Sequence, residues 1–193
     1  MSGSTSEMSR GLKKAEALRP GSHVAYVFAS TPEKQTMLFQ LCEQAVSTHN
    51  SYLLYISGKQ GVKGIRLSLK DVGFDVAFFE RARQFKIVDS EEWFLSSGRQ
   101  RSFKSNEELM NQIAGVASEA LSVGYPYATI VSETDSLVRK GFYSKYLELD
   151  EHIGTTLHNV KVALVCAFDQ RELEAAGAKS YREDILKAHS AVL

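Results

Sequence analysis

The segment Val160-Lys-Val-Ala-Leu-Val-Cys-Ala-Phe168 is almost continuously apolar, and it decides the fold class. A short apolar run rich in β-branched residues is typical of a strand that is buried on both faces. Tyr127-Ala-Thr-Ile-Val131 and the SYLLYIS run from Ser51 to Ser57 have the same character. Strands buried on both faces belong to parallel sheets that helices cover on each side. The segment therefore favours an α/β protein over an antiparallel or all-helical one.

Outward from this segment, apolar runs alternate with stretches in which apolar residues recur at helical spacing. Ser105-Asn-Glu-Glu108 is a capping-box pattern that predicts the start of one helix, and Gly124 is suited to end it. A second helix is predicted from Phe142 to His158, and residues 171–193 are predicted to be mostly helical. This alternation predicts a three-layer α/β fold around a mostly parallel central sheet. We predict its strands at His23–Phe28, Tyr52–Ser57, Lys86–Asp89, Tyr127–Ser132 and Lys161–Ala167.

The length of 193 residues favours a single domain with one buried sheet. Residues 1–17 are polar and carry no strand pattern, so we expect a mobile leader or a short helix there. We therefore assign residues 18–193 to one domain.

Composition excludes several classes of protein. Lys and Arg together number 23, as do Asp and Glu, so the net charge of zero argues against direct nucleic-acid binding and against binding to anionic membranes. No apolar run has the roughly 18–20 residues that span a bilayer, and the first 15 residues lack the apolar core of a signal peptide. We therefore expect a cytoplasmic protein with reduced cysteines. The basic segment from Arg99 to Lys104 is predicted to be an exposed loop, and an anionic partner for it is left open.

The turn after the first predicted strand does not have the pattern of a phosphate-binding loop. When the pattern G-x-x-x-x-G-K-[ST] is aligned on Lys34, Phe28 and Glu33 take the two glycine positions. Gln35 then takes the position of the hydroxyl residue that would contact magnesium. The sequence therefore predicts no functional ATP site.

The residues that follow the other strands are the next candidates, because ligands bind at the carboxyl ends of the strands in such sheets. Glu133 follows an apolar strand, as a magnesium-holding acid does in nucleotide hydrolases, but a capping or solvated role remains open. Cys166 lies inside an apolar run and is interpreted as a buried structural thiol. The histidines lack metal-ligand spacing, but a metal site shared by His23 and Cys166 is left open, and no catalytic set is found. We expect no catalytic residue, metal or cofactor.

Several short segments occur in an order and spacing that resemble a known family. They are Gly21-Ser-His23 with Tyr26, Glu33, Val72-Gly73-Phe74-Asp75, Glu91-Glu92-Trp93-Phe94, Gly124-Tyr125, Glu133, Tyr146-Leu147-Glu148, Cys166-Ala-Phe-Asp169 and His189. The chain resembles the MEDS family, the methanogen/methylotroph, DcmR-type sensory domains. This resemblance implies a relative of the RecA/KaiC fold with a degenerate phosphate loop. It also implies a prokaryotic signal-transduction role in sensing small hydrocarbon derivatives.

From the residues and the resemblance together, we predict a non-catalytic sensory domain that binds a small, mostly apolar organic ligand. The expected partner is a histidine kinase or a transcription regulator, and a homo-oligomer is left open. Two alternatives remain: a KaiC-like ATPase with a divergent phosphate loop, and a pure protein-interaction module. The candidate ligand-binding residues are His23, Tyr26, Glu33, Ser57, Trp93, Glu133 and Cys166. His23 and Cys166 are included because of the family resemblance.

Overall fold

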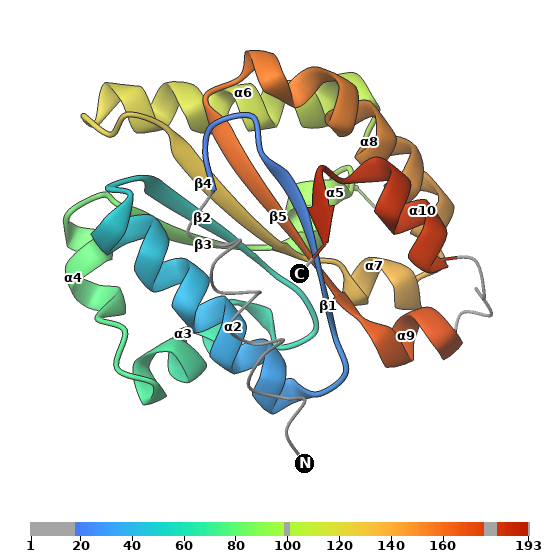
Figure 1. Ribbon diagram of the computed structural model, residues 1–193, viewed down its shortest axis with the longest axis horizontal. Coiled ribbons are helices and arrows are strands. Elements are labelled where there is room, and N and C mark those ends of the chain that lie inside the picture. Colours follow the sequence, from blue (N-terminus) through green and yellow to red (C-terminus); the bar gives the residue numbers. More distant parts are fainter. Residues whose placement is uncertain (1–17, 99–100, 176–180, 193) are drawn as a thin grey trace.

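The computed structural model describes residues 18–98, 101–175 and 181–192, and Figure 1 shows a central sheet between two layers of helices. The predicted leader at residues 1–17 lies outside the described residues. The sheet has six strands in the order β3-β2-β4-β5-β1-β6, and every neighbouring pair is parallel. The strands are β1 (His23–Phe28), β2 (Tyr52–Ser57), β3 (Phe85–Asp89), β4 (Ala128–Glu133), β5 (Val162–Asp169) and β6 (Ala191–Val192). The predicted three-layer α/β fold is therefore confirmed.

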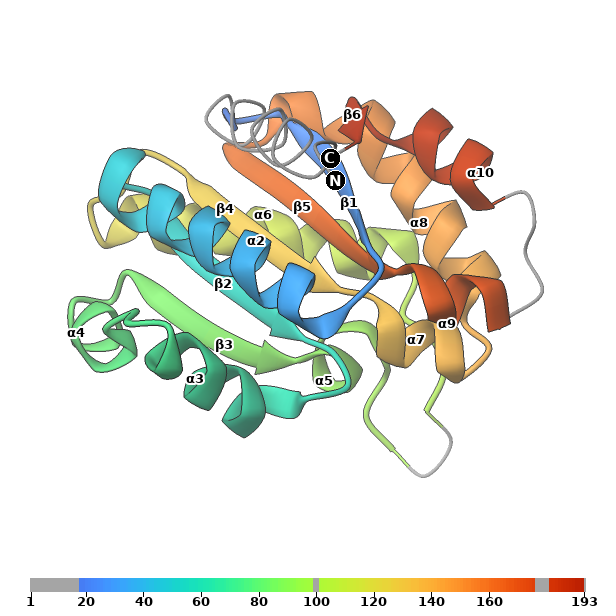
Figure 2. The same cartoon turned by 60° about the horizontal axis from the view of Figure 1, so that its bottom comes forward.

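The helices fall into three groups around this sheet (Figures 1 and 2). One face is covered by α2 (Thr31–Glu43), which continues as a π-helical turn (Gln44–Thr48), α3 (Gly61–Asp71) and α4 (Val76–Arg81). The other face is covered by α6 (Asn106–Ser122), α8 (Tyr143–Thr156), which continues as a 3-10 turn (Leu157–Asn159), and α10 (Tyr181–Ala188). Short helices directly follow the carboxyl ends of three strands, namely α5 (Ser90–Phe94), α7 (Asp135–Arg139) and α9 (Gln170–Ala175).

The strand predictions are correct in place, and two of them are correct to the residue, since β1 and β2 span the predicted ranges. Two details differ. From the sequence, Thr31 is a plausible cap for the first helix because Pro32 suits the first helical position. The cap is instead Ser30, because its hydroxyl accepts from the Glu33 amide. The predicted C-terminal helix is interrupted, because α10 ends at Ala188 and the chain then adds the two-residue strand β6 at the edge of the sheet. A strand of two residues is too short to show a periodicity.

Successive side chains of each strand point to opposite faces of the sheet, so the hydrophobic core has two halves. In β5, Leu164, Cys166 and Phe168 face α6 and α8, whereas Val165 and Ala167 face α2. Two sites with polar buried side chains form as a result, one on each face. Within the described residues, none of the helices combines the length and the apolar content needed to span a bilayer.

Candidate functional site

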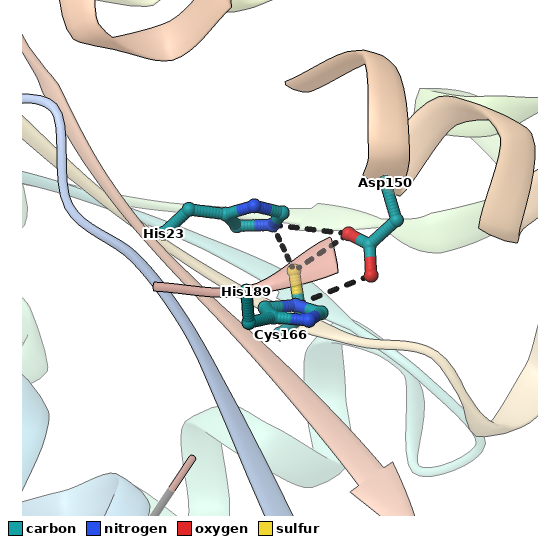
Figure 3. Close-up of side chains that lie close together, drawn as sticks. All are labelled: His23, Asp150, Cys166 and His189. Carbon is teal, nitrogen blue, oxygen red and sulfur yellow. Dashed lines mark hydrogen bonds and ion pairs between the residues drawn. The ribbon is translucent and has the colours of Figure 1, made fainter. Parts of the chain in front are cut away.

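Four side chains converge on the α8 face of the sheet, and we call them the His–Cys–Asp cluster: His23, Asp150, Cys166 and His189 (Figure 3). Parallel pairing of β1 with β5 sets Ala25 opposite Cys166, so His23 lies two residues away and points to the same face. Asp150 projects from α8, and His189 follows the last residue of α10. The cluster therefore joins four segments that are far apart in sequence.

Short distances join the four side chains. His23 Nε2 lies 3.0 Å from Asp150 Oδ1 and 3.5 Å from Cys166 Sγ. The thiol is 3.6 Å from the same carboxylate oxygen. On the other side of the carboxylate, His189 Nε2 lies 3.2 Å from Asp150 Oδ2. Asp150 is thus the centre of the cluster, and it is completely buried.

The orientation of His189 is determined by a backbone contact. Its Nδ1 lies 2.8 Å from the carbonyl oxygen of Ile185, and a carbonyl only accepts, so Nδ1 carries the proton. Burial lowers the pKa of His189 to about 4; the Asp150 carboxylate opposes this shift and the neighbouring His23 adds to it. The imidazole is therefore neutral near pH 7, and its Nε2 lone pair faces the carboxylate.

Cys166 connects this cluster to a neighbouring pocket. Burial and the Asp150 charge raise the pKa of the Cys166 thiol, while a hydrogen bond from Tyr146 opposes the rise. The Tyr146 hydroxyl also lies beside Ser132. Tyr146 and Ser132 both line the adjacent pocket, so a polar path leads from the cluster to it.

This pocket, which we call the Trp93 pocket, lies between the sheet and helices α5, α6 and α8. Its interior has room for about one water molecule and is surrounded by mostly apolar side chains. They are Ile56, Trp93, Phe94, Leu109, Ile113, Ile130, Ser132, Tyr146, Leu149, Ile153 and Leu164. The Ser132 hydroxyl is buried in this wall, beside the Tyr146 hydroxyl. An apolar wall with a few polar groups is typical of a site for a small organic molecule.

On the opposite face, Lys34 and Glu133 form a buried ion pair with an Nζ–Oε2 distance of 3.1 Å. Lys34 also donates to Gln60, and the hydroxyl of Tyr55 donates to Glu133 at 2.5 Å. Burial raises the pKa of Glu133, against the opposing effects of Lys34 and Tyr55. The lysine at the position of a phosphate-binding lysine is therefore already neutralised by the protein itself.

The turn between β1 and α2 is stabilised by the side chains of Glu33 and Ser30. The Glu33 carboxylate accepts from the Ala29 amide at 2.9 Å, and the Ser30 hydroxyl accepts from the Glu33 amide. Amides at a helix N-terminus are the donors that a phosphate would use. Here a carboxylate and a hydroxyl of the chain use them instead.

The seven candidate residues from the sequence fall into separate places. His23 and Cys166 come together in the His–Cys–Asp cluster, and Trp93 lines the Trp93 pocket. Glu133 is held in the ion pair on the other face. The remaining residues make local contacts: Tyr26 donates to the backbone carbonyl of Glu33, and Ser57 donates to that of Val88. The candidates therefore lie on both faces of the sheet, and their role in binding a ligand stays a prediction.

Sequence reasoning missed two members of the cluster. Asp150 is a charged residue within the apolar stripe of α8, where Tyr146, Leu149 and Ile153 are buried. A charge on the buried face of a helix is a signal that could have been used, since buried charges require partners. His189 is a candidate only through the family resemblance, and nothing in its sequence context predicts that it lies beside Asp150.

The predicted basic loop is only partly described, because Arg99 lies outside the described residues. Arg101 pairs with Glu91 at 2.8 Å. Lys104 donates to the carbonyl oxygens of Glu92 and Trp93, and to the side chain of Gln112. Both described cations thus hold α5 in place.

Comparison with known proteins identifies the family and the fold of the chain. No curated protein matches it in sequence. One of the solved structures that match is a KaiC-like protein from the hyperthermophilic archaeon Pyrococcus horikoshii OT3, with a TM-score of 0.55 and 13% sequence identity. The alignment covers 78% of this chain and 62% of that protein, so this chain spans less than two thirds of its length. The likeness shows a shared fold. The sequence profile of the methanogen/methylotroph, DcmR sensory domain matches residues 22–189, and the chain therefore belongs to the MEDS family of sensory domains.

Proposed function

We propose that this protein is a non-catalytic sensory domain that binds a small, mostly apolar organic molecule in the Trp93 pocket. The family supports a sensory role in signal transduction. The observation that carries the ligand proposal is the pocket itself, in which aliphatic and aromatic side chains surround the neighbouring Ser132 and Tyr146 hydroxyls. A ligand with an apolar body and one polar group would form a hydrogen bond with Ser132 while its body contacts the apolar wall.

The narrowness of the pocket limits the size of this ligand. The pocket admits only a group about the size of one water molecule, because the lining side chains approach closely. A ligand with several heavy atoms must therefore displace a side chain. Trp93 is the candidate, since it is only partly buried and lies on the five-residue helix α5.

Movement of Trp93 provides a route for the signal. The Trp93 carbonyl oxygen accepts from Lys104 Nζ at 2.7 Å and from Gln112 Nε2 at 3.3 Å. A shift of Trp93 would therefore change the hydrogen bonds that join it to α6 and to the segment that carries Lys104. We propose that a signalling partner, such as a histidine kinase or a transcription regulator, reads this change.

The test uses Trp93 as its probe, because it is the only tryptophan in the chain. The protein is titrated with short-chain alcohols, amines, thiols and halides while tryptophan fluorescence and the thermal unfolding midpoint are recorded. We expect at least one class to change the emission of Trp93 and to raise the midpoint in a saturable way, since a ligand that binds only the folded state stabilises it. Flat responses to every class would contradict the proposal.

Two variants locate the binding. Ser132→Ala removes the polar anchor and is expected to weaken binding about tenfold, the effect of one lost hydrogen bond of about 1–1.5 kcal/mol. Ile130→Phe fills the pocket and is expected to abolish the response. The matched control is Gln35→Ala, in a second pocket between α2 and α3 on the opposite face. Equal loss in the control and in Ser132→Ala would place the ligand elsewhere.

Nucleotide is expected to have no effect. The Glu33 carboxylate accepts from the Ala29 amide, and the Ser30 hydroxyl accepts from the Glu33 amide. Glu133 neutralises Lys34, so ATP would have to displace two carboxylates and a hydroxyl. We therefore expect neither ATP turnover nor a change in the thermal midpoint when ATP and magnesium are added. Magnesium-dependent hydrolysis that is lost in a Lys34→Met variant would support the ATPase alternative instead.

A further inference from the structure

We propose that the His–Cys–Asp cluster is a binding site for one zinc-like divalent cation, held by His23, Asp150, Cys166 and His189. This proposal replaces our expectation from the sequence that no metal is bound. It does not rest on the proposed sensing of an organic ligand. Its first support is geometric, since each of the four residues offers a donor atom to the same small volume, as Figure 3 shows.

The spacing of these atoms matches a tetrahedral site. All four donor atoms lie within 4.8 Å of one another. The closest recorded pairs lie between 3.0 and 3.6 Å, for the His23–Asp150 and Cys166–Asp150 contacts. With zinc–ligand bonds of about 2.0–2.3 Å, the donors of a tetrahedral site are about 3.3–3.8 Å apart. Movements of the donor atoms by well under one zinc–ligand bond length would therefore bring all four into a tetrahedral arrangement.

The contact between His189 and Asp150 is the second support. The Nδ1 atom of His189 is directed at the Ile185 carbonyl oxygen, so Nε2 is the ring nitrogen that is left for other contacts. Nε2 faces Asp150 Oδ2 at 3.2 Å, and neither atom has a well-formed hydrogen bond within the described residues. A positive charge between the two atoms, either a proton on Nε2 or a metal ion, stabilises this contact, and a metal ion would be coordinated by both atoms.

The donor types select the class of metal. Thiolate and imidazole donors suit zinc and its neighbours in the transition series, whereas magnesium and calcium prefer sets made of oxygen. The Cys166 thiol would lose its proton to solvent as the sulfur–metal bond forms. The thiolate and the Asp150 carboxylate would then balance the two positive charges, which favours burial of the site.

The surroundings match a structural rather than a catalytic zinc site. The four residues are all buried and supply four ligands, so no open position remains for substrate. The Ile185 carbonyl already orients His189, as outer-shell partners do in zinc sites. The ion would fasten the segment after α10 to β1, β5 and α8.

The experiment is a metal titration of the full chain after treatment with a chelator. Cobalt(II) is the spectroscopic probe, and zinc is then added as a competitor. We expect one equivalent of cobalt to bind with a thiolate-to-cobalt charge-transfer band and tetrahedral d–d bands, and zinc to abolish these bands. Zinc should also raise the thermal unfolding midpoint of the chelator-treated protein. Absence of the charge-transfer band in the wild type would overturn the proposal, without any bearing on the sensing of an organic ligand.

Variants assign the ligands. Cys166→Ser is expected to remove the charge-transfer band, and Asp150→Asn and His189→Gln to weaken zinc binding at least about tenfold. The matched controls are Cys42→Ser, the other buried cysteine, which lies on the opposite face, and His152→Gln, which alters an exposed histidine of α8. Both controls should bind as the wild type does. Loss of the band in Cys42→Ser but not in Cys166→Ser would overturn the assignment, and Cys42→Ser with an intact band supports it even if a cluster variant fails to fold.

Discussion

Replacing Glu133 by glutamine is expected to lower the free energy of unfolding by about 3–5 kcal/mol, the usual cost of removing one partner from a buried ion pair. Glutamine has nearly the same shape. Its oxygen can still accept from the Gly58 amide, and its NH2 group can donate to the Tyr55 hydroxyl, which donates to Glu133 in the wild type. The Lys34 ammonium would lose its counter-charge while its side chain stays only 6% exposed. The remaining ring face of Phe28, 5.6 Å from Nζ, is a weak substitute. Urea unfolding of the purified variant measures the loss.

The double variant Lys34→Met/Glu133→Gln distinguishes a charge effect from a packing effect. Lys34→Met alone leaves an acid whose pKa burial already raises, so it can become neutral by taking up a proton at a smaller cost. With both charges removed, stability should return to within about 2 kcal/mol of the wild type, giving a coupling energy of at least about 2 kcal/mol. Simple additivity of the two single losses would show that the ion pair is unimportant.

Gly58→Ala is expected to destabilise the fold by about 2–4 kcal/mol, because it combines overpacking with lost hydrogen bonds. A Cβ at this position would lie 1.9 Å from Asp135 Oδ1 and 2.9 Å from the Cβ of Glu133. That carboxylate oxygen accepts from the amides of Lys59 and Ser136, so its displacement breaks two contacts at once. Thermal and urea unfolding measure the effect.

Gly115→Ala is the matched control for this glycine. Gly115 is exposed within α6, and a Cβ there meets no atom within 4 Å. Alanine at such a helical position is expected to stabilise by about 0.5–1 kcal/mol. If Gly58→Ala proved as harmless as Gly115→Ala, the close approach of the two acids to the turn after β2 would be contradicted.

The fold was predictable because strand burial leaves a local pattern. β1 and β2 are short apolar runs between turn residues, and their limits follow from their own sequences. Capping is equally local, and the Ser105–Glu108 capping box is present as predicted. The strand β6 has only two residues and depends on pairing with Val24 and Ala25, which no periodicity reveals.

The site was less predictable because its members meet only through tertiary structure. His23 and Cys166 become neighbours through the register of β1 against β5, which requires knowledge of the strand order. Asp150 is 127 residues from His23 in sequence, and His189 lies beyond α10. Lys34 was considered only as a phosphate-binding group, whereas the side chain that it meets is Glu133, 99 residues away.

The two faces of the sheet thus differ in which ligands they can bind. On the α2 face, an ion pair and a self-capped turn occupy the positions that a nucleotide would need. On the α8 face, an apolar pocket adjoins a cluster of soft donors through Tyr146. A sensory domain built on this fold would therefore bind its ligand on the α8 face, which is the central claim of our account.

Methyl-resolved NMR tests this claim most directly. Isoleucine and leucine methyl groups are labelled, and the organic compound that most raises the thermal midpoint is titrated into the protein. We predict that the perturbed signals belong to Ile113, Ile130 and Ile153 of the Trp93 pocket, while Ile65 and Leu69 between α2 and α3 stay unchanged. Perturbation of Ile65 and Leu69 with silence at Ile130 would contradict the account, because it would place the ligand on the nucleotide-like face.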